Sequence, residues 1–187
     1  MGSKGSKNVS LKEKEIELLI NNTGLSREEI SEWHVQFIKD YPDGLIDLVE
    51  FTNLYKKFYK IGNPEKYAKF AFKAFDNDNN GRITFSEFLV ATSFSINANK
   101  NDDAQKSLEF AFDIYDVDDN GKIDQKEALL VLSAVYELEG RNVLYAQKTV
   151  DEFFKSYDTD NSGFLNKKEF VTALLNDSYF RSVFLAN

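Results

Sequence analysis

Acidic and amide side chains recur at a fixed spacing in three segments of the chain, each twelve residues long. The segments are Asp76–Glu87, Asp116–Glu127 and Asp158–Glu169. Each has Asp at positions 1 and 3, Asn or Ser at position 5, Gly at position 6 and Glu at position 12. A hard cation such as Ca²⁺ binds roughly six to eight oxygen atoms, and this spacing lets one loop surround one ion. The three segments are therefore predicted to bind calcium.

The pattern is that of an EF-hand loop. Side-chain oxygens come from positions 1, 3, 5, 9 and 12, and a backbone carbonyl comes from position 7. A polar turn without an ion is the alternative, but it must explain agreement at seven positions in all three loops. Three Ca²⁺ sites are expected, which Mg²⁺ could occupy in the absence of calcium. The predicted ligands are Asp76, Asp78, Asn80, Arg82 (carbonyl), Thr84 and Glu87; Asp116, Asp118, Asn120, Lys122 (carbonyl), Asp124 and Glu127; and Asp158, Asp160, Ser162, Phe164 (carbonyl), Asn166 and Glu169.

An earlier segment has the same frame but lacks the ligands. If Gly44 is at position 6 and Glu50 at position 12, then Lys39 falls at position 1, Tyr41 at position 3 and Pro42 at position 4. A cation then replaces the first carboxylate, and proline fixes φ near about −65° where the loop must curl. This loop is predicted to hold no ion and to serve as a structural partner of the next one.

Residues at helical spacing flank the loops, so each unit should be helix–loop–helix. Exit helices are predicted over Phe85–Ser95, Gln125–Leu138 and Lys167–Leu175. Every loop glycine is followed two residues later by Ile or Leu, and these positions are expected to pair the first loop with the second and the third with the fourth. The predicted fold class is all-α: two pairs of EF-hands, with extra N-terminal and C-terminal helices and short inter-loop β pairs.

Capping patterns mark the extra helices and the boundaries. Ser10 with Glu13 predicts a helix over residues 11–21, and Ser26 with Glu29 predicts the start of the first entering helix. A short last helix through Phe184 should be capped by Asp177 or Ser178, and Gly140 is a predicted helix C-cap. Residues 1–9 are expected to be a flexible, acylated tail, 10–97 the N-terminal EF-hand pair and 98–187 the C-terminal pair. Ser95–Asp103 is the predicted linker.

Composition argues against several functions. The net charge of −8 would repel phosphates, so nucleic acid is not expected as a partner. The chain has no Cys and one His, so thiolate sites and cysteine nucleophiles are impossible and zinc sites are not expected. No nucleophile–base pair and no phosphate-binding Gly-rich loop is visible, so the protein is not expected to be an enzyme.

Together these residues resemble the neuronal calcium sensor family, the recoverin-like and frequenin-like EF-hand proteins. The marks span most of the chain: Met1-Gly2 with Ser6, the helix around Trp33 and Phe37-Ile38-Lys39-Asp40, Pro42-Asp43-Gly44, Gly62-Asn63-Pro64, Phe85-Ser86-Glu87-Phe88-Leu89 and the three complete loops. Two departures are Tyr41, where the family usually has Cys, and Thr92, where it usually has Leu. The resemblance implies a signalling protein that senses calcium.

The N-terminal residues match a lipidation pattern. Met1–Ser6 fits N-myristoylation with Gly2 as the acceptor. One myristoyl chain binds membranes only marginally, with a constant of about 10⁴ M⁻¹, and nearby lysines add roughly 1 kcal/mol each at an anionic surface. A flexible Gly/Ser/Lys tail is the alternative. The expected localisation is cytoplasmic, and peripheral to a membrane when the chain is acylated.

The chain is 14% aromatic but has a single Met, so any target groove should be lined by aromatic and aliphatic side chains. The resemblance implies a groove for an amphipathic helix of a target protein. For each of these positions an ordinary core role is the alternative. The implied groove residues are Trp33, Phe37, Phe51, Tyr55, Phe58, Phe75, Phe88 and Leu89.

The predicted function is a calcium sensor that binds about three Ca²⁺ ions, exposes an apolar groove and regulates a target protein at a membrane. One alternative is a passive calcium buffer, which would bind the ions but open little. Another is a calcium-binding regulatory subunit of an enzyme, similar to calcineurin B. In similar proteins the acyl chain is either released by calcium or always exposed, and the sequence leaves both open.

Overall fold

The structure is a computed structural model that describes residues 10–96 and 101–185. Gly2 and the rest of the predicted tail lie outside the described residues. The described residues form α1 (Glu13–Thr23), α2 (Arg27–Asp40), α3 (Leu48–Phe58), α4 (Glu65–Phe75), α5 (Phe85–Ile96), α6 (Asn101–Tyr115), α7 (Gln125–Leu138), the 3₁₀ helix η1 (Val143–Tyr145), α8 (Ala146–Tyr157), α9 (Lys167–Asn176) and α10 (Ser178–Phe184). Within these residues, no helix is both long enough and apolar enough to cross a membrane.

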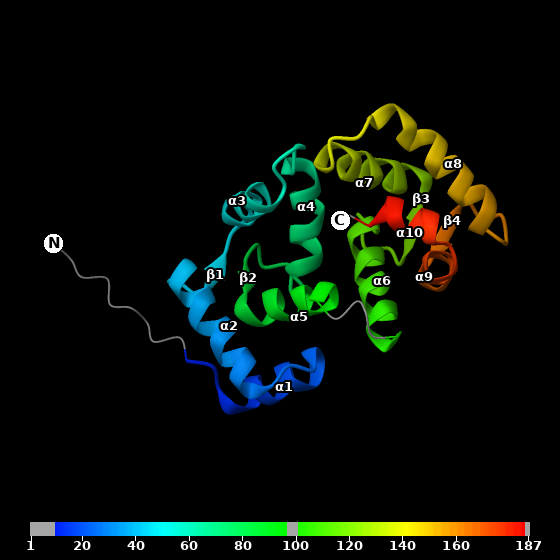
Figure 1. Cartoon of the computed structure of the whole chain (residues 1–187). Helices are drawn as coiled ribbons and strands as arrows, with labels where there is room; N and C mark the ends of the chain where they lie inside the picture. Colours follow the sequence, from blue (N-terminus) through cyan, green and yellow to red (C-terminus); the bar gives the residue numbers. More distant parts are fainter. Residues whose placement is uncertain (1–9, 97–100, 186–187) are drawn as a thin grey trace.

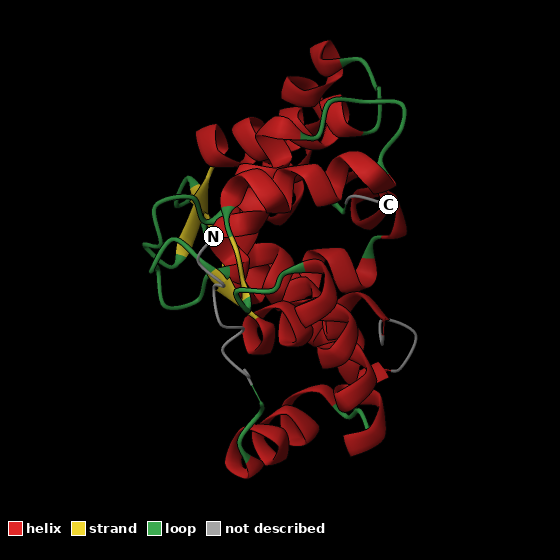
Figure 2. Ribbon diagram, turned by 90° about the vertical axis from the view of Figure 1, so that its left-hand side faces the viewer, coloured by secondary structure: helices red, strands yellow, loops and turns green. Residues whose placement is uncertain are grey.

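Four helix–loop–helix units follow one another, with α1 in front of them and α10 after them (Figure 1). We call α1–α5 the N-terminal half and α6–α10 the C-terminal half. Strands β1 (Leu45–Ile46) and β2 (Ile83–Thr84) pair antiparallel, as do β3 (Lys122–Asp124) and β4 (Phe164–Asn166). Figure 2 shows both short pairs on one side of the helices. The predicted all-α fold with two EF-hand pairs is confirmed.

The position-8 residues explain the pairing of the loops. Ile46 lies opposite Ile83, and Ile123 lies opposite Leu165. All four side chains are fully buried. Backbone hydrogen bonds join the two strands of each pair. Burial of these apolar side chains stabilises the pair further, by about 25 cal/mol for each Å² of apolar surface removed from water. The incomplete first loop still takes part in this arrangement.

Helix starts are set by side-chain caps, and one predicted cap is wrong. The Ser26 side chain accepts from the Glu29 N–H and the Glu29 carboxylate accepts from the Ser26 N–H, as predicted. Helix α1 instead begins at Glu13, with Lys12 as an N-cap that makes no side-chain bond. The reason is that the Glu13 carboxylate is ion-paired with Arg27, so it does not fold back onto the backbone near Ser10.

Two further predictions concern where α10 begins and where the linker between the halves lies. Asp177, rather than Ser178, caps α10, because its carboxylate accepts from the N–H groups of Tyr179 and Phe180. The predicted linker is too long at both ends, since α5 continues to Ile96 and α6 begins at Asn101. Asn and Asp are favoured at helix N-caps as well as in turns, so their presence could not place the boundary.

Aromatic side chains build the core of the C-terminal half. The Phe184 ring of α10 lies 4.3 Å from the Phe153 ring and 5.4 Å from the Tyr115 ring, measured between centroids. The Tyr115 hydroxyl donates to the Phe184 carbonyl at 2.9 Å. Phe180, Val183 and Phe184 are all buried. Helix α10 therefore fills the apolar face between the helices of this half.

The two halves dock through a close backbone contact after α3. The Asn63 N–H donates to the Glu137 carbonyl at 2.8 Å, and Lys66 pairs with the Glu137 carboxylate at 2.6 Å. A carbon added at Gly62 would lie 2.0 Å from the Leu138 carbonyl oxygen. Helix α7 has Glu139 rather than the predicted Gly140 as its C-cap; Gly140, with φ of 67°, follows it and turns the chain so that the Arg141 N–H bonds to the Tyr136 carbonyl. Only glycine fits at position 62, because any side chain there would clash with the backbone at the end of α7.

Candidate metal centre

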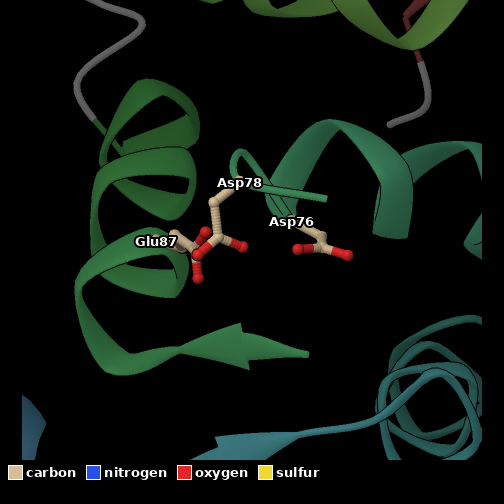
Figure 3. Close-up of side chains that lie close together, drawn as sticks. All are labelled: Asp76, Asp78 and Glu87. Carbon is tan, nitrogen blue, oxygen red and sulfur yellow. The ribbon is translucent and has the colours of Figure 1, made fainter. Parts of the chain in front are cut away.

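Three carboxylates of the second loop gather at one point (Figure 3). Asp76 follows the last residue of α4, Asp78 lies in the loop, and Glu87 is in the first turn of α5. Each offers a carboxylate oxygen, and these oxygens all lie within 4.8 Å of one another. Carboxylates held this close repel each other unless a cation or proton lies between them.

The third loop repeats this geometry on the next pair of helices. Oxygens of Asp116, Asp118 and Glu127 also lie within 4.8 Å of one another. Asp116, like Asp76 in the second loop, is only 5% exposed. Buried carboxylates require a charge partner, and an all-oxygen donor set suits the hard cation Ca²⁺. The residues present therefore fit calcium at both loops.

The first Asp of each complete loop also organises the backbone. Asp76 accepts from the N–H groups of Asn80 and Gly81, at 3.0 and 2.8 Å. Asp116 accepts from the equivalent pair at the same two distances. Asp158 accepts from the Ser162 and Gly163 N–H groups at 3.0 and 2.9 Å. These bonds hold the loop curled with its carboxylates directed inward.

Position 4 of the complete loops has a role that the sequence analysis missed. Asn79, Asp119 and Asn161 have positive φ values of 54°, 57° and 53°. Among residues with a side chain, Asn and Asp tolerate this left-handed conformation best. The recurrence of Asn or Asp directly after the Asp at position 3 could have indicated this role from the sequence alone. Position 4 therefore curls the loop, in addition to the glycine at position 6.

The first loop departs from this path for a reason visible in its sequence. Its position 4 is Pro42, whose ring excludes positive φ. Helix α2 runs through Asp40, so Lys39 at position 1 is still helical. Glu50 at position 12 and Asp47 form a capping box for α3. The first loop keeps the strand and the helix start but provides no first carboxylate ligand.

The fourth loop has the sequence but a less compact arrangement. Within the described residues, Asp158, Asp160 and Glu169 do not form a group like those of the other two loops. The Thr159 hydroxyl donates to Glu169 at 3.1 Å. Hydrogen bonds from the Ser162 side chain and backbone lower the pKa of Asp160 below its usual value. The Ser162 N–H donates to both Asp158 and Asp160 at 3.0 Å, so these two carboxylates still lie together as in the other loops.

The remaining predicted ligands lie where the pattern requires. Position 9 residues make contact with the Glu at position 12: the Thr84 hydroxyl donates to Glu87 at 2.7 Å, and Asp124 and Asn166 cap α7 and α9. The carbonyl positions lie at the strands, with Lys122 and Phe164 opening β3 and β4 and Arg82 just before β2. Asn80 and Asn120 are at position 5, and the Asn120 side chain accepts from the Lys122 N–H at 2.9 Å.

An apolar pocket of about 530 Å³ opens in the N-terminal half. Phe37 and Leu89 do not line it. They are 4% and 0% exposed and face the core, with Phe37 packed edge-on against Phe85 at 5.3 Å. Six of the eight predicted groove residues line the pocket, together with three residues outside those eight: Trp33, Phe51, Tyr55, Phe58, Phe75 and Phe88, then Leu54, Tyr59 and Thr92.

Comparison with known proteins agrees with the assignment of these loops as EF-hand loops. A family model described as an EF-hand domain pair matches residues 105–175, and one described as an EF hand domain matches residues 67–93. The fold and these matches define an EF-hand protein.

Curated relatives narrow the class. Over 93 residues the chain is 44% identical to "Neuronal calcium sensor 1" of Aplysia californica, covering 50% of this chain and 47% of that protein. Over 86 residues it is 36% identical to "Recoverin" of Homo sapiens, covering 46% and 43%. The chain spans about half the length of the curated relatives that it matches. These similarities agree with the resemblance to the neuronal calcium sensor family that the motifs of the chain indicate.

Proposed function

We propose that this protein is a calcium sensor that binds about three Ca²⁺ ions, opens an apolar groove and regulates a target protein at a membrane. One observation carries the proposal. The second loop begins at Asp76, directly after Phe75, and ends at Glu87, directly before Phe88. Phe75 and Phe88 both line the apolar pocket. Groove residues and metal ligands are therefore neighbours on the same two helices.

This arrangement links the position of Glu87 to the groove. Its carboxylate accepts from the Thr84 N–H at 2.9 Å and from the Thr84 hydroxyl. Bound calcium would supply the positive charge that offsets the repulsion among the carboxylates of the loop. Because Glu87 lies in the first turn of α5, a shift of its backbone toward Asp76 on ion binding would move that helix and Phe88 with it. EF-hand sensors open a hydrophobic groove by this kind of helix movement.

The proposed occupant of the groove is an amphipathic helix of a target protein. Such helices place apolar side chains into a groove at helical spacing. Phe58 is 73% exposed at the pocket edge, which suits contact with a partner. In the C-terminal half, the equivalent apolar face is already filled by α10. The N-terminal half is therefore the proposed target-binding half.

Calcium is expected to increase the fluorescence of an apolar-surface dye in the unmodified protein. The increase should be lost in Glu87→Gln, because this change weakens the only complete loop attached to the groove helices. Glu169→Gln is the matched control, since it alters the fourth loop and should keep most of the increase. A passive buffer would bind calcium with no dye response in any of the three proteins, and that result would overturn the sensor proposal.

Membrane attachment is proposed through a myristoyl group on Gly2 and the basic N-terminus. After coexpression with an N-myristoyltransferase, mass spectrometry should find one acyl chain on the protein and none on Gly2→Ala. The acylated form should sediment with vesicles that contain anionic lipid, and the added attraction of the lysines should weaken at high salt. An unmodified N-terminal glycine under these conditions would contradict the anchor.

The regulatory-subunit alternative predicts a different result. A dedicated subunit would copurify with a catalytic chain from its native source, as calcineurin B-like proteins would. The incomplete first loop favours the sensor over this alternative. For the sensor, the proposed location is cytoplasmic and, when the chain is acylated, peripheral to a membrane.

A further inference from the structure

A lysine of the N-terminal half reaches the third calcium loop. Lys73 lies in the last turn of α4, and its Nζ donates to the Val117 carbonyl at 2.7 Å and to the Asp116 carbonyl at 3.4 Å. The same Nζ pairs with the Asp119 carboxylate at 2.8 Å. The contact joins residues more than forty positions apart. Three acceptors on one loop turn hold this ammonium group in place.

Lys73 contacts the outside of the loop and leaves the predicted ligands free. The carbonyls of positions 1 and 2 are not predicted ligands, since the carbonyl ligand is at position 7. Asp119 is at position 4, and its side chain is 60% exposed. The Lys73 side chain is 32% exposed, so it is partly shielded from water and salt. A positive charge is therefore fixed beside the site without occupying it.

Helix α4 is thus shared by two calcium loops. Its last residue, Phe75, precedes Asp76, the first ligand of the second loop, while Lys73 is bonded to the third loop. The third loop carries five carboxylates, four of them predicted ligands: Asp116, Asp118, Asp119, Asp124 and Glu127. Lys73 relieves their mutual repulsion most strongly when no metal cation is present.

We propose that Lys73 is a positioning residue that couples the third calcium loop to docking of the two halves and lowers the calcium affinity of that loop. The proposal rests on calcium binding by the third loop. A bound divalent cation reduces the net negative charge that attracts Lys73, so the lysine contact and the ion weaken each other. Such coupling is reciprocal by thermodynamic necessity. Calcium at the third loop then loosens α4 in the other half of the protein.

The first test uses a background in which only the third loop keeps its ligands, Glu87→Gln with Glu169→Gln. In that background Lys73→Met should raise the calcium affinity measured by calorimetry by about three- to tenfold at low salt, and less at high salt. Lys69→Met is the matched control, because it removes an exposed charge one turn away on α4. It should change the affinity by less than about twofold.

The second test is a double-mutant cycle between Lys73→Met and Asp119→Asn, read by thermal unfolding. The effects of the two changes on the stability of the fold should be non-additive without calcium and closer to additive with calcium. Equal affinities for Lys73→Met and Lys69→Met, a lower affinity for Lys73→Met, or the same non-additivity in both states would overturn the proposal. Absence of any binding heat in the background protein would instead show that the third loop does not bind calcium.

Discussion

Glu127→Gln is expected to remove one of the three proposed calcium-binding sites. The Glu127 carboxylate belongs to the compact group with Asp116 and Asp118, and Oε1 accepts from the Val117 N–H at 2.9 Å. Glutamine keeps one oxygen but loses the charge and the second ligand oxygen. Loss of an outer partner of a metal ligand costs roughly 10- to 100-fold in affinity, and loss of the ligand charge itself should cost more than 100-fold.

Calorimetric calcium titration of the non-acylated protein measures this effect. The unmodified protein should show three sites, and Glu87→Gln, Glu127→Gln and Glu169→Gln should each lose one. Glu50→Gln is the matched control, because Glu50 is at position 12 of the loop that lacks its first carboxylate, and it should leave three sites. A fourth site in the unmodified protein would contradict the argument from Lys39 and Pro42.

Gly62→Ala is expected to reduce the free energy of unfolding by about 3 kcal/mol, the upper end of the usual cost of overpacking. The added carbon would lie 2.0 Å from the Leu138 carbonyl oxygen and 2.1 Å from that of Glu137. These are backbone atoms at the end of α7, so no side-chain rotation relieves the clash. For a chain of this size the midpoint of thermal unfolding should fall by roughly 10 °C.

Gly24→Ala separates this steric effect from backbone strain. Gly24 has φ of 68°, but a carbon added there would have nothing within 4 Å. It should therefore cost only the left-handed conformation, about 1 kcal/mol. Thermal and denaturant unfolding in the absence of calcium would compare the two variants. If Gly62→Ala were no less stable than Gly24→Ala, the docking contact between the halves would not be tightly packed.

Much of the fold could be predicted because each unit repeats the same local rules. A periodic apolar face, a glycine at position 6 and a capping Glu at position 12 fix a helix–loop–helix almost independently of its neighbours. The exit helix Gln125–Leu138 matches its predicted bounds, and the other two exit helices differ by one residue at their C-terminal ends. The pairing of Ile46 with Ile83 follows from the same register.

Features that depend on contacts between units could not be read from the chain. Glu13 pairs with Arg27 instead of capping its own helix, because the two helices bring their charges together. Phe37 and Leu89 lie on the same helices as groove residues, but packing alone decides which apolar side chain faces the core. The contact between Lys73 and Asp119 joins two units, and nothing in either local pattern indicates it.

The antiparallel strands β1 and β2 join a loop without its first ligand to a complete one. Under the proposed assignment, the half that carries the groove then responds to a single ion, with no second site in the same pair to sharpen the response. Apart from the coupling proposed through Lys73, its calcium dependence should be graded, with a Hill slope of about one. The C-terminal half, where β3 joins two complete loops, has the architecture for a cooperative response. The groove would then respond gradually to rising calcium, whereas the C-terminal half would respond over a narrow range of calcium concentration.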